Sequence, residues 1–327
     1  MIETILDIQS LRVSLPTDRG VLNAVRGVDL QIKRGQTLCL VGESGCGKSL
    51  TAMSIMGLLP RYAQVTSDRF EMVGQDLSKK TEAKLAKMRG RDVAMIFQDP
   101  TSALNPTLTI GRQLTEGVMR SEGLSRKEAD ARAIELLDRV GISNPAARLT
   151  QYPHGFSGGQ RQRIMIASAL MGRPRLLIAD EPTTALDVTI QAQILQLLGE
   201  LQSDLGLSML LITHDLGVVA AIATEVAVMY AGRIAECASA SDLFATPMHP
   251  YTKGLLAAIP VPGVTPRGCE LPAIPGRVPG LIGTMNGCAF RDRCAHSLSR
   301  CADDPVPQYY PGTGRFVECV KAAEVET

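Results

Sequence analysis

The stretch TLCLVGESGCGKS, residues 37–49, joins a short apolar run to a glycine-rich turn. The run at 37–41 is continuous, which is typical of a strand buried in a parallel sheet. The turn fits the pattern G-x-x-x-x-G-K-[ST]. Glycine lets the backbone turn tightly and aim its N–H groups at phosphate oxygens, and a following helix adds its positive end. The stretch therefore predicts a phosphate-binding loop between a buried strand and a helix.

Individual residues of this loop have expected roles. Lys48 would reach the β- and γ-phosphates of a nucleotide, and the Ser49 hydroxyl would bind Mg²⁺. Cys39 and Cys46 are interpreted as small packing residues. The predicted nucleotide contacts are Gly42, Glu43, Ser44, Gly45, Cys46, Gly47, Lys48, Ser49 and Leu50.

Three further apolar runs, at 93–97, 176–179 and 209–212, repeat the pattern of the first strand. Helical patterns lie between such runs, for example at 127–140 and 190–205. Buried strands that alternate with helices predict an α/β core.

Segments outside this core have other patterns. Residues 6–15 and 28–33 alternate apolar and polar side chains, which predicts antiparallel strands. Strand patterns are missing at about 99–165, where we expect an inserted helical subdomain. From about residue 247 Pro and Gly recur, which predicts a largely irregular extension.

Two carboxylates end the apolar run LLIADE at 176–181. The carboxyl edge of a parallel sheet is where nucleotide sites form. Asp180 can hold Mg²⁺ there, usually through water, and Glu181 can orient and polarise an attacking water. Strands often end in Asp or Glu, so this signal gains its meaning from the phosphate-binding loop.

A second glycine-rich turn, FSGGQ at 156–160, precedes the apolar helical run RIMIASALM. A serine at a helix start beside two glycines can form an anion-binding nest. An ordinary capped helix is the alternative. A second phosphate nest in one chain has a purpose if two chains pair head to tail, so that this nest closes on the partner's nucleotide.

Taken together, these motifs resemble those of ABC-type ATPases over about residues 5–245. Walker A corresponds to 42–49, Walker B to 176–181 and the signature loop to 156–160. The resemblance implies a P-loop core, with a RecA-like parallel sheet and antiparallel N-terminal strands. It also implies ATP and Mg²⁺ as ligands. In this division, 1–247 is the ATP-binding domain and 248–327 is an extension.

The resemblance also assigns single residues. Gln98 matches the Q-loop glutamine, Asp187 the D-loop aspartate at the dimer interface, and His214 the switch histidine that touches the γ-phosphate. The implied catalytic residues are Glu181, His214 and Gln98; the Mg²⁺ ligands are Ser49, Gln98 and Asp180; and Ser157, Gly158, Gly159 and Gln160 contact ATP in trans.

Three positions depart from the family pattern. Leu15 stands near where an aromatic side chain usually stacks on adenine, so the base is expected to meet only apolar contact. Phe156 replaces the usual Leu at the start of the signature loop, with little expected effect. Leu50 stands where Ser or Thr is commoner, which removes one hydroxyl near the phosphates.

The C-terminal end resembles the extension of dipeptide, oligopeptide and nickel importer ATPases. The similar segments are HPYT at 249–252, LLAAIP at 255–260 and GCAF at 287–290. Four cysteines follow the spacing C-x5-C-x6-C-x17-C, which is not that of a zinc ribbon. A [4Fe–4S] cluster, a zinc ion and free thiols are the three interpretations, and relatives are thought to carry the cluster. The four residues are Cys288, Cys294, Cys301 and Cys319.

Composition excludes several classes. The 327 residues carry a formal net charge of +1 and no Lys/Arg-dense tract, so no nucleic-acid footprint is expected. Neither a basic signal-peptide start nor an apolar run of about 18 residues is visible. A membrane role would therefore need docking on another chain. The resemblance implies a peripheral location on the cytoplasmic face of the bacterial cell membrane.

The expected function is ATP hydrolysis that energises import of dipeptides or oligopeptides. The resemblance implies a second, homologous ATPase chain, two permease subunits and an extracytoplasmic solute-binding protein as partners. Nickel, glutathione or another small solute is the alternative cargo, because substrate choice belongs to other subunits. A soluble ABC ATPase of DNA repair or translation is a remote alternative, since the chain has one cassette and no sustained heptads.

Overall fold

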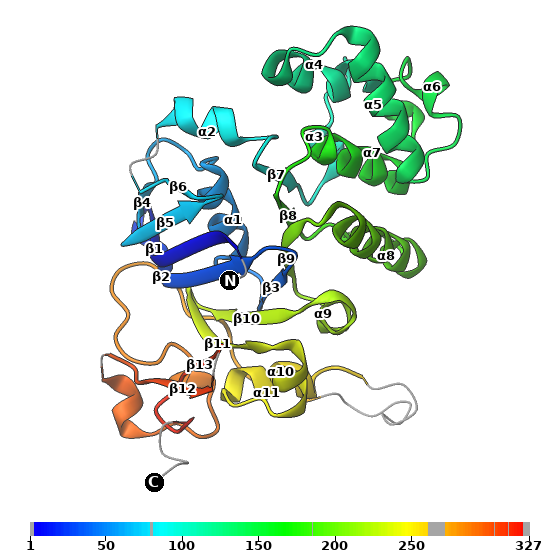
Figure 1. Cartoon of the computed structure of the whole chain (residues 1–327). Helices are drawn as coiled ribbons and strands as arrows, with labels where there is room; N and C mark the ends of the chain where they lie inside the picture. The colour runs from blue at the N-terminus through cyan, green and yellow to red at the C-terminus, as the bar shows by residue number, and fades with distance from the viewer. Residues whose placement is uncertain are drawn as a thin grey trace. The chain divides into compact units, whose positions relative to one another are not determined.

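The computed structural model describes residues 3–78, 81–184, 186–260, 272–303, 305–312 and 314–322. The chain divides into two compact units. The first unit comprises Met1–Leu6, Ile32–Gln36 and Glu71–Ile212, and the second comprises Asp7–Gln31, Thr37–Phe70 and Thr213–Thr327. Figure 1 labels the helices and strands of both units.

Parallel strands form the centre of the first unit. β8 (Leu176–Asp180) pairs in parallel with β7 (Val93–Ile96) on one side and with β9 (Ser208–Thr213) on the other. All residues of these strands are buried, which explains why their sequences are continuous apolar runs rather than alternating ones. α8 (Val188–Leu205) lies between β8 and β9 in the chain, so the strands and helix predicted from these sequences are confirmed.

Only helices and connecting turns occur between β7 and β8, where the structure describes every residue. Figure 1 shows α3 to α7 as one helical cluster, coloured green. A capping box starts α5, because Ser125 and Glu128 bond each other's backbone N–H groups. The helices are α3 (Pro100–Ala103), α4 (Ile110–Glu122), α5 (Arg126–Arg139), α6 (Pro145–Arg148) and α7 (Gly158–Leu170), with a 3-10 turn at Pro153–Gly155.

The second unit contains the strand that leads into the phosphate-binding loop. β3 (Thr37–Val41) is fully buried and pairs in parallel with β10 (Glu225–Tyr230), as its sequence predicts. β11 (Arg233–Ser239) continues this sheet antiparallel to β10. The helices are α1 (Lys48–Met56), α9 (Leu216–Ile222), α10 (Ala240–Ala245) and α11 (Pro250–Ala257).

The remaining strands are mostly antiparallel. β1 (Thr4–Thr17) and β2 (Gly20–Lys33) contain the two alternating segments, and β1 pairs antiparallel with β4. The short elements β4 (Gln64–Thr66), β5 (Arg69–Met72), β6 (Gln75–Asp76) and α2 (Glu82–Met88) were not expected from the sequence.

The C-terminal extension contains little regular structure in its described residues, as predicted. Two 3-10 turns, Arg291–Arg293 and Ser299–Ala302, follow α11. The extension is nevertheless tied to the sheet of the second unit: β13 (Arg315–Glu318) pairs with β11, and β12 (Gln308–Gly312) pairs with β13. The sequence did not indicate this pairing, and the boundary at 247/248 stays a prediction.

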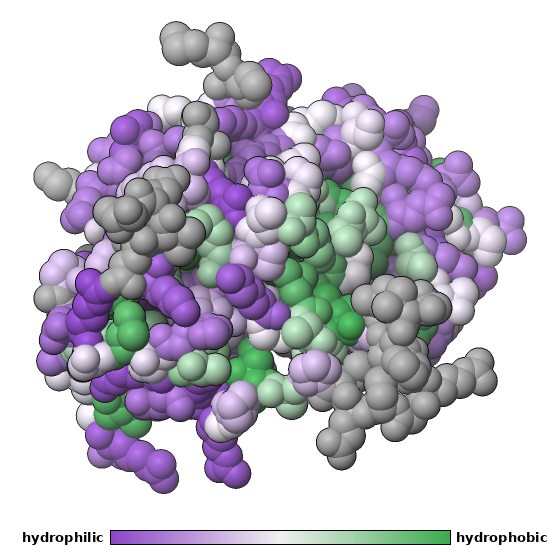
Figure 2. Space-filling model, turned by 90° about the horizontal axis from the view of Figure 1, so that it is seen from below, coloured by the Kyte–Doolittle hydropathy of each residue, from purple (hydrophilic) through white to green (hydrophobic). Residues whose placement is uncertain are grey.

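Hydrophilic residues dominate the face shown in Figure 2, and hydrophobic residues gather in one area of it. Within the described residues, every helix is too short or too polar to cross a membrane.

Candidate functional site

The phosphate-binding loop lies in the second unit, between β3 and α1. Two of its glycines are needed for steric reasons. A Cβ at Gly42 would stand 2.1 Å from the Met229 carbonyl oxygen, and one at Gly47 would stand 2.5 Å from that of Ala24. Gly47 also has a φ of +110°, which other residues rarely adopt. The loop conformation therefore requires glycine at both positions.

Lys48 is directed back into the loop. Its ammonium donates to the carbonyl oxygens of Gly42 (2.7 Å) and Glu43 (3.0 Å), and the residue is 5% exposed. α1 starts at Lys48, and its N-cap residue is Gly47. Because glycine has no side chain, the helix start has no side-chain cap. The first-turn N–H groups of such a helix suit an anion, and Lys48 adds a positive charge beside them.

His214 and Asp215 follow β9 in the second unit. The His214 side chain is exposed, while Asp215 caps α9 by accepting hydrogen bonds from the N–H groups of Gly217 (2.8 Å) and Val218 (3.4 Å). His214 thus lies directly before a fixed helix start, where its backbone is well defined.

The two carboxylates of the 176–181 motif differ in their surroundings. Asp180 is buried at the end of β8, whereas Glu181 has a strained φ of +46°. The Glu181 backbone N–H donates to the Ile212 carbonyl oxygen (2.9 Å). The Glu181 Oε2 accepts hydrogen bonds from Gln98 Nε2 (2.9 Å) and Thr184 Oγ1 (2.8 Å). Strain of this kind persists where surrounding contacts over-determine it and is concentrated at functional sites.

Gln98 and Glu181 are therefore brought together within the first unit, 83 residues apart in the chain. Thr184, the second partner of Glu181, was missed by the sequence analysis. A hydroxyl three residues after a loop carboxylate is a local signal that could have revealed it.

The signature loop starts α7 in the first unit. Ser157 is the N-cap, and its hydroxyl accepts from the Gln160 N–H (3.4 Å) while Gln160 Oε1 accepts from the Ser157 N–H (3.0 Å). Ser157 and Gly158 are exposed. The predicted helix start is confirmed, and within this chain Gly158 is exposed to solvent while Gly159 is half-buried.

Asp187 lies at the start of α8 and is exposed. Its carboxylate accepts from the Ile190 N–H at 2.9 Å, so it is an N-cap. The hydrogen bonds of Asp187 and Ser157 are local, to groups three or four residues along the chain. Their interface and trans-contact roles stay predictions.

The cysteine-bearing part of the extension lies in the second unit. The Cys288 N–H donates to the Cys301 carbonyl oxygen at 2.8 Å. Two sulfurs accept backbone hydrogen bonds, Cys294 from His296 and Cys301 from Leu298, both at 3.4 Å. Cys269 lies outside the described residues. The described cysteines form no disulfide with one another; they are Cys39, Cys46, Cys237, Cys288, Cys294, Cys301 and Cys319.

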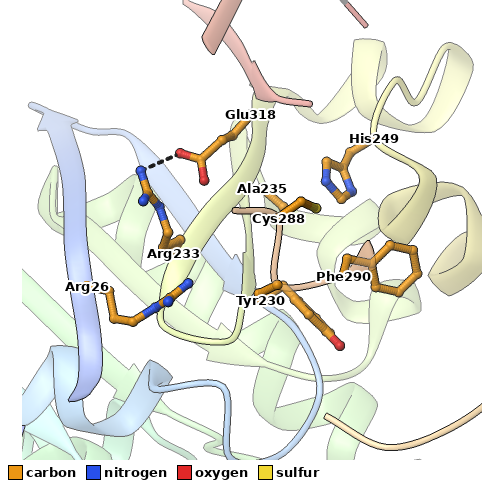
Figure 3. A pocket seen from close by; sticks show the side chains of 9 residues that line it. Arg26, Tyr230, Arg233, Ala235, His249, Cys288, Phe290 and Glu318 are labelled. Carbon is orange, nitrogen blue, oxygen red and sulfur yellow. Dashed lines mark hydrogen bonds and ion pairs between the residues drawn. The ribbon is translucent and has the colours of Figure 1, made fainter. Parts of the chain in front are cut away.

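The pKa of Cys288 is raised to about 11, mainly by burial, with smaller contributions from the neighbouring thiols of Cys319, Cys301 and Cys294 and against a backbone hydrogen bond from Phe290 that lowers it. The four side chains thus influence one another electrostatically. Figure 3 shows Cys288 at a pocket beside His249 and Phe290. Among the described residues, no three His, Cys, Asp or Glu side chains converge as they would around a single ion.

These parts define a class of protein. A glycine loop with a buried lysine, an acidic pair after a buried strand and a strained, hydrogen-bonded glutamate are the components of a P-loop nucleoside triphosphatase. Comparison with known proteins narrows the class. Residues 25–184 match the family described as ABC transporter, and residues 235–301 match the oligopeptide/dipeptide transporter C-terminal region.

Similar curated proteins share nearly the whole chain. The dipeptide transport ATP-binding protein DppD of Bacillus subtilis is 51% identical over 95% of this chain and 91% of its own length. The oligopeptide transport ATP-binding protein AppD of the same organism is 46% identical over 97% of this chain and 96% of its own length. The chain therefore belongs to the family of ABC-transporter ATP-binding proteins of the dipeptide and oligopeptide type, and it is an ATPase.

Solved structures agree on the fold. A dimeric ATP-binding cassette, MJ0796, bound to ADP and phosphate, has a TM-score of 0.64 at 24% identity, covering 72% of this chain and 99% of that one. CbiO1 of Clostridium perfringens, part of an ABC transporter complex, has a TM-score of 0.63 at 28% identity, covering 75% and 92%. The predicted ABC-type α/β fold is confirmed.

Proposed function

We propose that this chain hydrolyses ATP to energise the import of dipeptides or oligopeptides. The observation that carries this proposal is Glu181, held in a strained conformation by Gln98 and Thr184 directly after Asp180, in a chain similar to peptide-transport ATPases along its length. A fixed carboxylate at that position suits proton abstraction from an attacking water.

Each site residue then has a task in one turnover. The loop N–H groups and Lys48 bind the phosphates, and Glu181 orients the water and accepts its proton. His214 contacts the γ-phosphate. Ser49, Gln98 and Asp180 would hold Mg²⁺, which when bound would supply positive charge to neutralise the phosphate oxygens. The donor set fits this ion, because hydroxyl, amide and carboxylate oxygens are the ligands that Mg²⁺ prefers.

The proposed assembly contains two permeases in the membrane, two ATPase chains on its cytoplasmic face and a binding protein on the opposite, extracytoplasmic side. The exposed, self-capped signature loop supports a head-to-tail pair in which Ser157, Gly158, Gly159 and Gln160 close on the partner's ATP and Asp187 lies at the interface.

A groove in the helical part of the first unit supports permease docking. It is lined by residues of α3, of the segment after α3, of α4 and of α7, and the first of them, Ala103, lies five residues after Gln98 in the chain. A permease segment in this groove would act on the chain that leads to the water-orienting site. The lining includes Leu104, Asn105, Leu108, Gln113, Gly117 and Ser168.

Transport by the whole assembly tests this function. The chain is co-purified with its ATPase partner and permeases, placed in vesicles with ATP on the accessible cytoplasmic side, and supplied with binding protein and a labelled dipeptide. We expect peptide uptake that stops when Lys48→Ala replaces the native chain. Uptake of nickel or glutathione instead of peptide would reassign the cargo while keeping the ATPase.

The four extension cysteines are proposed to hold a [4Fe–4S] cluster. Backbone N–H groups that point at Cys294 and Cys301 sulfurs support this, since such bonds stabilise cluster thiolates. The thiols of Cys294, Cys301 and Cys319 contribute to the raised pKa of Cys288, so the four side chains lie near one another, as a shared set of ligands requires. The role of the cluster is structural, because ATP hydrolysis needs no electron transfer.

Metal analysis decides between the alternatives. After anaerobic purification we expect about four iron and four sulfide per chain with broad visible absorption. Cys301→Ser should lose both, while Cys237→Ser, the matched control on β11, should keep them. One zinc per chain would indicate a zinc site, and no metal would mean free thiols.

A further inference from the structure

Glu43 of the phosphate-binding loop is held by two residues of the C-terminal extension, all within the second unit. Its carboxylate accepts two parallel hydrogen bonds from Arg293, Nη1 to Oε2 at 2.6 Å and Nη2 to Oε1 at 3.0 Å. Its backbone N–H donates to the Tyr251 hydroxyl at 2.9 Å. Both the side chain and the main chain of this loop residue are therefore fixed from outside the loop.

Arg293 is itself immobilised. Besides Glu43, its guanidinium donates to the carbonyl oxygens of Pro275 (2.8 Å) and Ile274 (3.3 Å) and to the Tyr230 hydroxyl (3.3 Å). These contacts use all five of its N–H donors, and the side chain is only 6% exposed. A lysine could not reproduce this planar, forked set of bonds.

Tyr251 is fixed in a similar way. The buried Glu236 carboxylate accepts from the N–H groups of Met248 and His249, both at 2.9 Å, and thereby holds the start of α11. His249 Nδ1 then accepts from the Tyr251 N–H at 3.0 Å. The Tyr251 ring is fully buried, with its centroid 4.6 Å from that of Tyr230.

The same brace reaches the cysteines. Arg293 lies between Cys288 and Cys294, and its N–H donates to Phe290 at 3.0 Å. Figure 3 shows Tyr230, His249, Cys288 and Phe290 around one pocket of the second unit. The position of the Arg293 guanidinium therefore depends on the conformation of the segment that carries Cys288 and Cys294.

We propose that Arg293 is a positioning residue of the ATP site and that the extension acts as a brace on the phosphate-binding loop. Two effects follow. The brace orders the loop before ATP binds, so ATP binding does not include the entropic cost of ordering the loop. Arg293 also neutralises the Glu43 carboxylate, which would otherwise repel the phosphates. This inference rests on the ATPase activity described above.

The test is ATP hydrolysis by the full transporter complex, with KM and kcat measured separately. For Arg293→Met we expect the KM for ATP to rise about tenfold, with kcat within about twofold of the native value. Arg293→Lys should fall between the two, because it keeps the charge but not the fork. Arg291→Met is the matched control: it lies in the same turn, bonds Asn286 instead of the loop, and should leave KM unchanged.

A rescue experiment separates this role from a merely structural one. Glu43→Gln removes the charge that Arg293 neutralises, so the double variant Glu43→Gln/Arg293→Met should have a lower KM than Arg293→Met alone. A folding defect would not be relieved in this way. Thermal unfolding of each complex is recorded, and if Arg293→Met does not fold, Arg293→Lys with and without Glu43→Gln replaces it.

Unchanged KM in Arg293→Met and Arg293→Lys would overturn the inference while leaving the ATPase in place. A double variant no better than the single one would also overturn it, because the Glu43 charge would then be irrelevant. A native complex that hydrolyses no ATP would instead refute the function on which the inference rests.

Discussion

The two glycine-rich loops of this chain are stabilised in different ways. The signature loop is held by its own helix, through hydrogen bonds between Ser157 and Gln160, three residues apart. The phosphate-binding loop is held at Glu43 by Tyr251 and Arg293, which lie 208 and 250 residues further along the chain.

The two loops also differ in how far their side chains are exposed to solvent. Ser157 is exposed, whereas Lys48 is 5% exposed and Cys46 is fully buried. A loop that caps itself can be displayed at a surface for a second chain to use. The loop that must cradle phosphates exposes only its tip, Ser44 and Gly45; it is buried at both ends and depends on distant parts of the fold.

The largest expected effect comes from Glu181→Gln, which stops hydrolysis but keeps both loops. We expect turnover to fall at least about a hundredfold, because the group that accepts the water's proton is lost. ATP binding should persist, so both loops can be examined around trapped nucleotide. Turnover in the purified complex above about a tenth of the native rate would contradict the assignment.

Ser157→Arg should disable the partner's nucleotide site rather than the one built on this chain's Lys48. The arginine would fill the nest that closes on the partner's phosphates. Nucleotide trapping in a complex with one mutated ATPase chain shows which P-loop is affected. An unaffected partner site would contradict the proposal that the signature loop acts on the partner's nucleotide while the phosphate-binding loop acts on this chain's own.

Among the residues that hold the phosphate-binding loop, His249 should make the stability of the protein depend on pH. Burial lowers the pKa of this side chain from its usual 6.5 to about 4, and its hydrogen bond to the Glu318 backbone opposes the shift only in part. The unfolded chain therefore binds a proton more readily, so stability is lost as pH falls. We expect a loss of about 2 kcal/mol between about pH 7 and pH 5.

His249→Asn is the control for this pH effect. Its side-chain oxygen can still cap α11, but it does not titrate, so urea unfolding should depend less on pH. An equal slope in both proteins would assign the pH dependence to other groups.

The smallest effects compare two capping boxes. Ser125→Ala at α5 and Ser157→Ala at α7 should each lower the free energy of unfolding by about 1 kcal/mol, because each removes one helix cap. Only Ser157→Ala should also reduce ATP turnover. Equal turnover in both variants would mean that the signature serine is only a cap.

The features that could be predicted from the sequence and those that could not are divided in the same way, between local and distant contacts. The strand and turn at 37–49, the cap at Ser157 and the acidic pair at 180–181 depend on neighbours in sequence, and their local structure was predicted. The partners of Glu43 and Glu181 depend on tertiary packing. Arg293 and Tyr251 carry no local mark of their contact with the loop, and the β13–β11 pairing has none either.

The long separation between Glu43 and Arg293 also has a consequence during synthesis. A ribosome adds about 5 to 20 residues per second, so the arginine appears on the order of 10 to 50 seconds after the loop it braces. Until then the growing chain carries a nucleotide loop whose acidic residue has no guanidinium beside it. Tight ATP binding then becomes a property of the finished polypeptide, and a chain that is cut or stalled before residue 293 competes poorly for nucleotide.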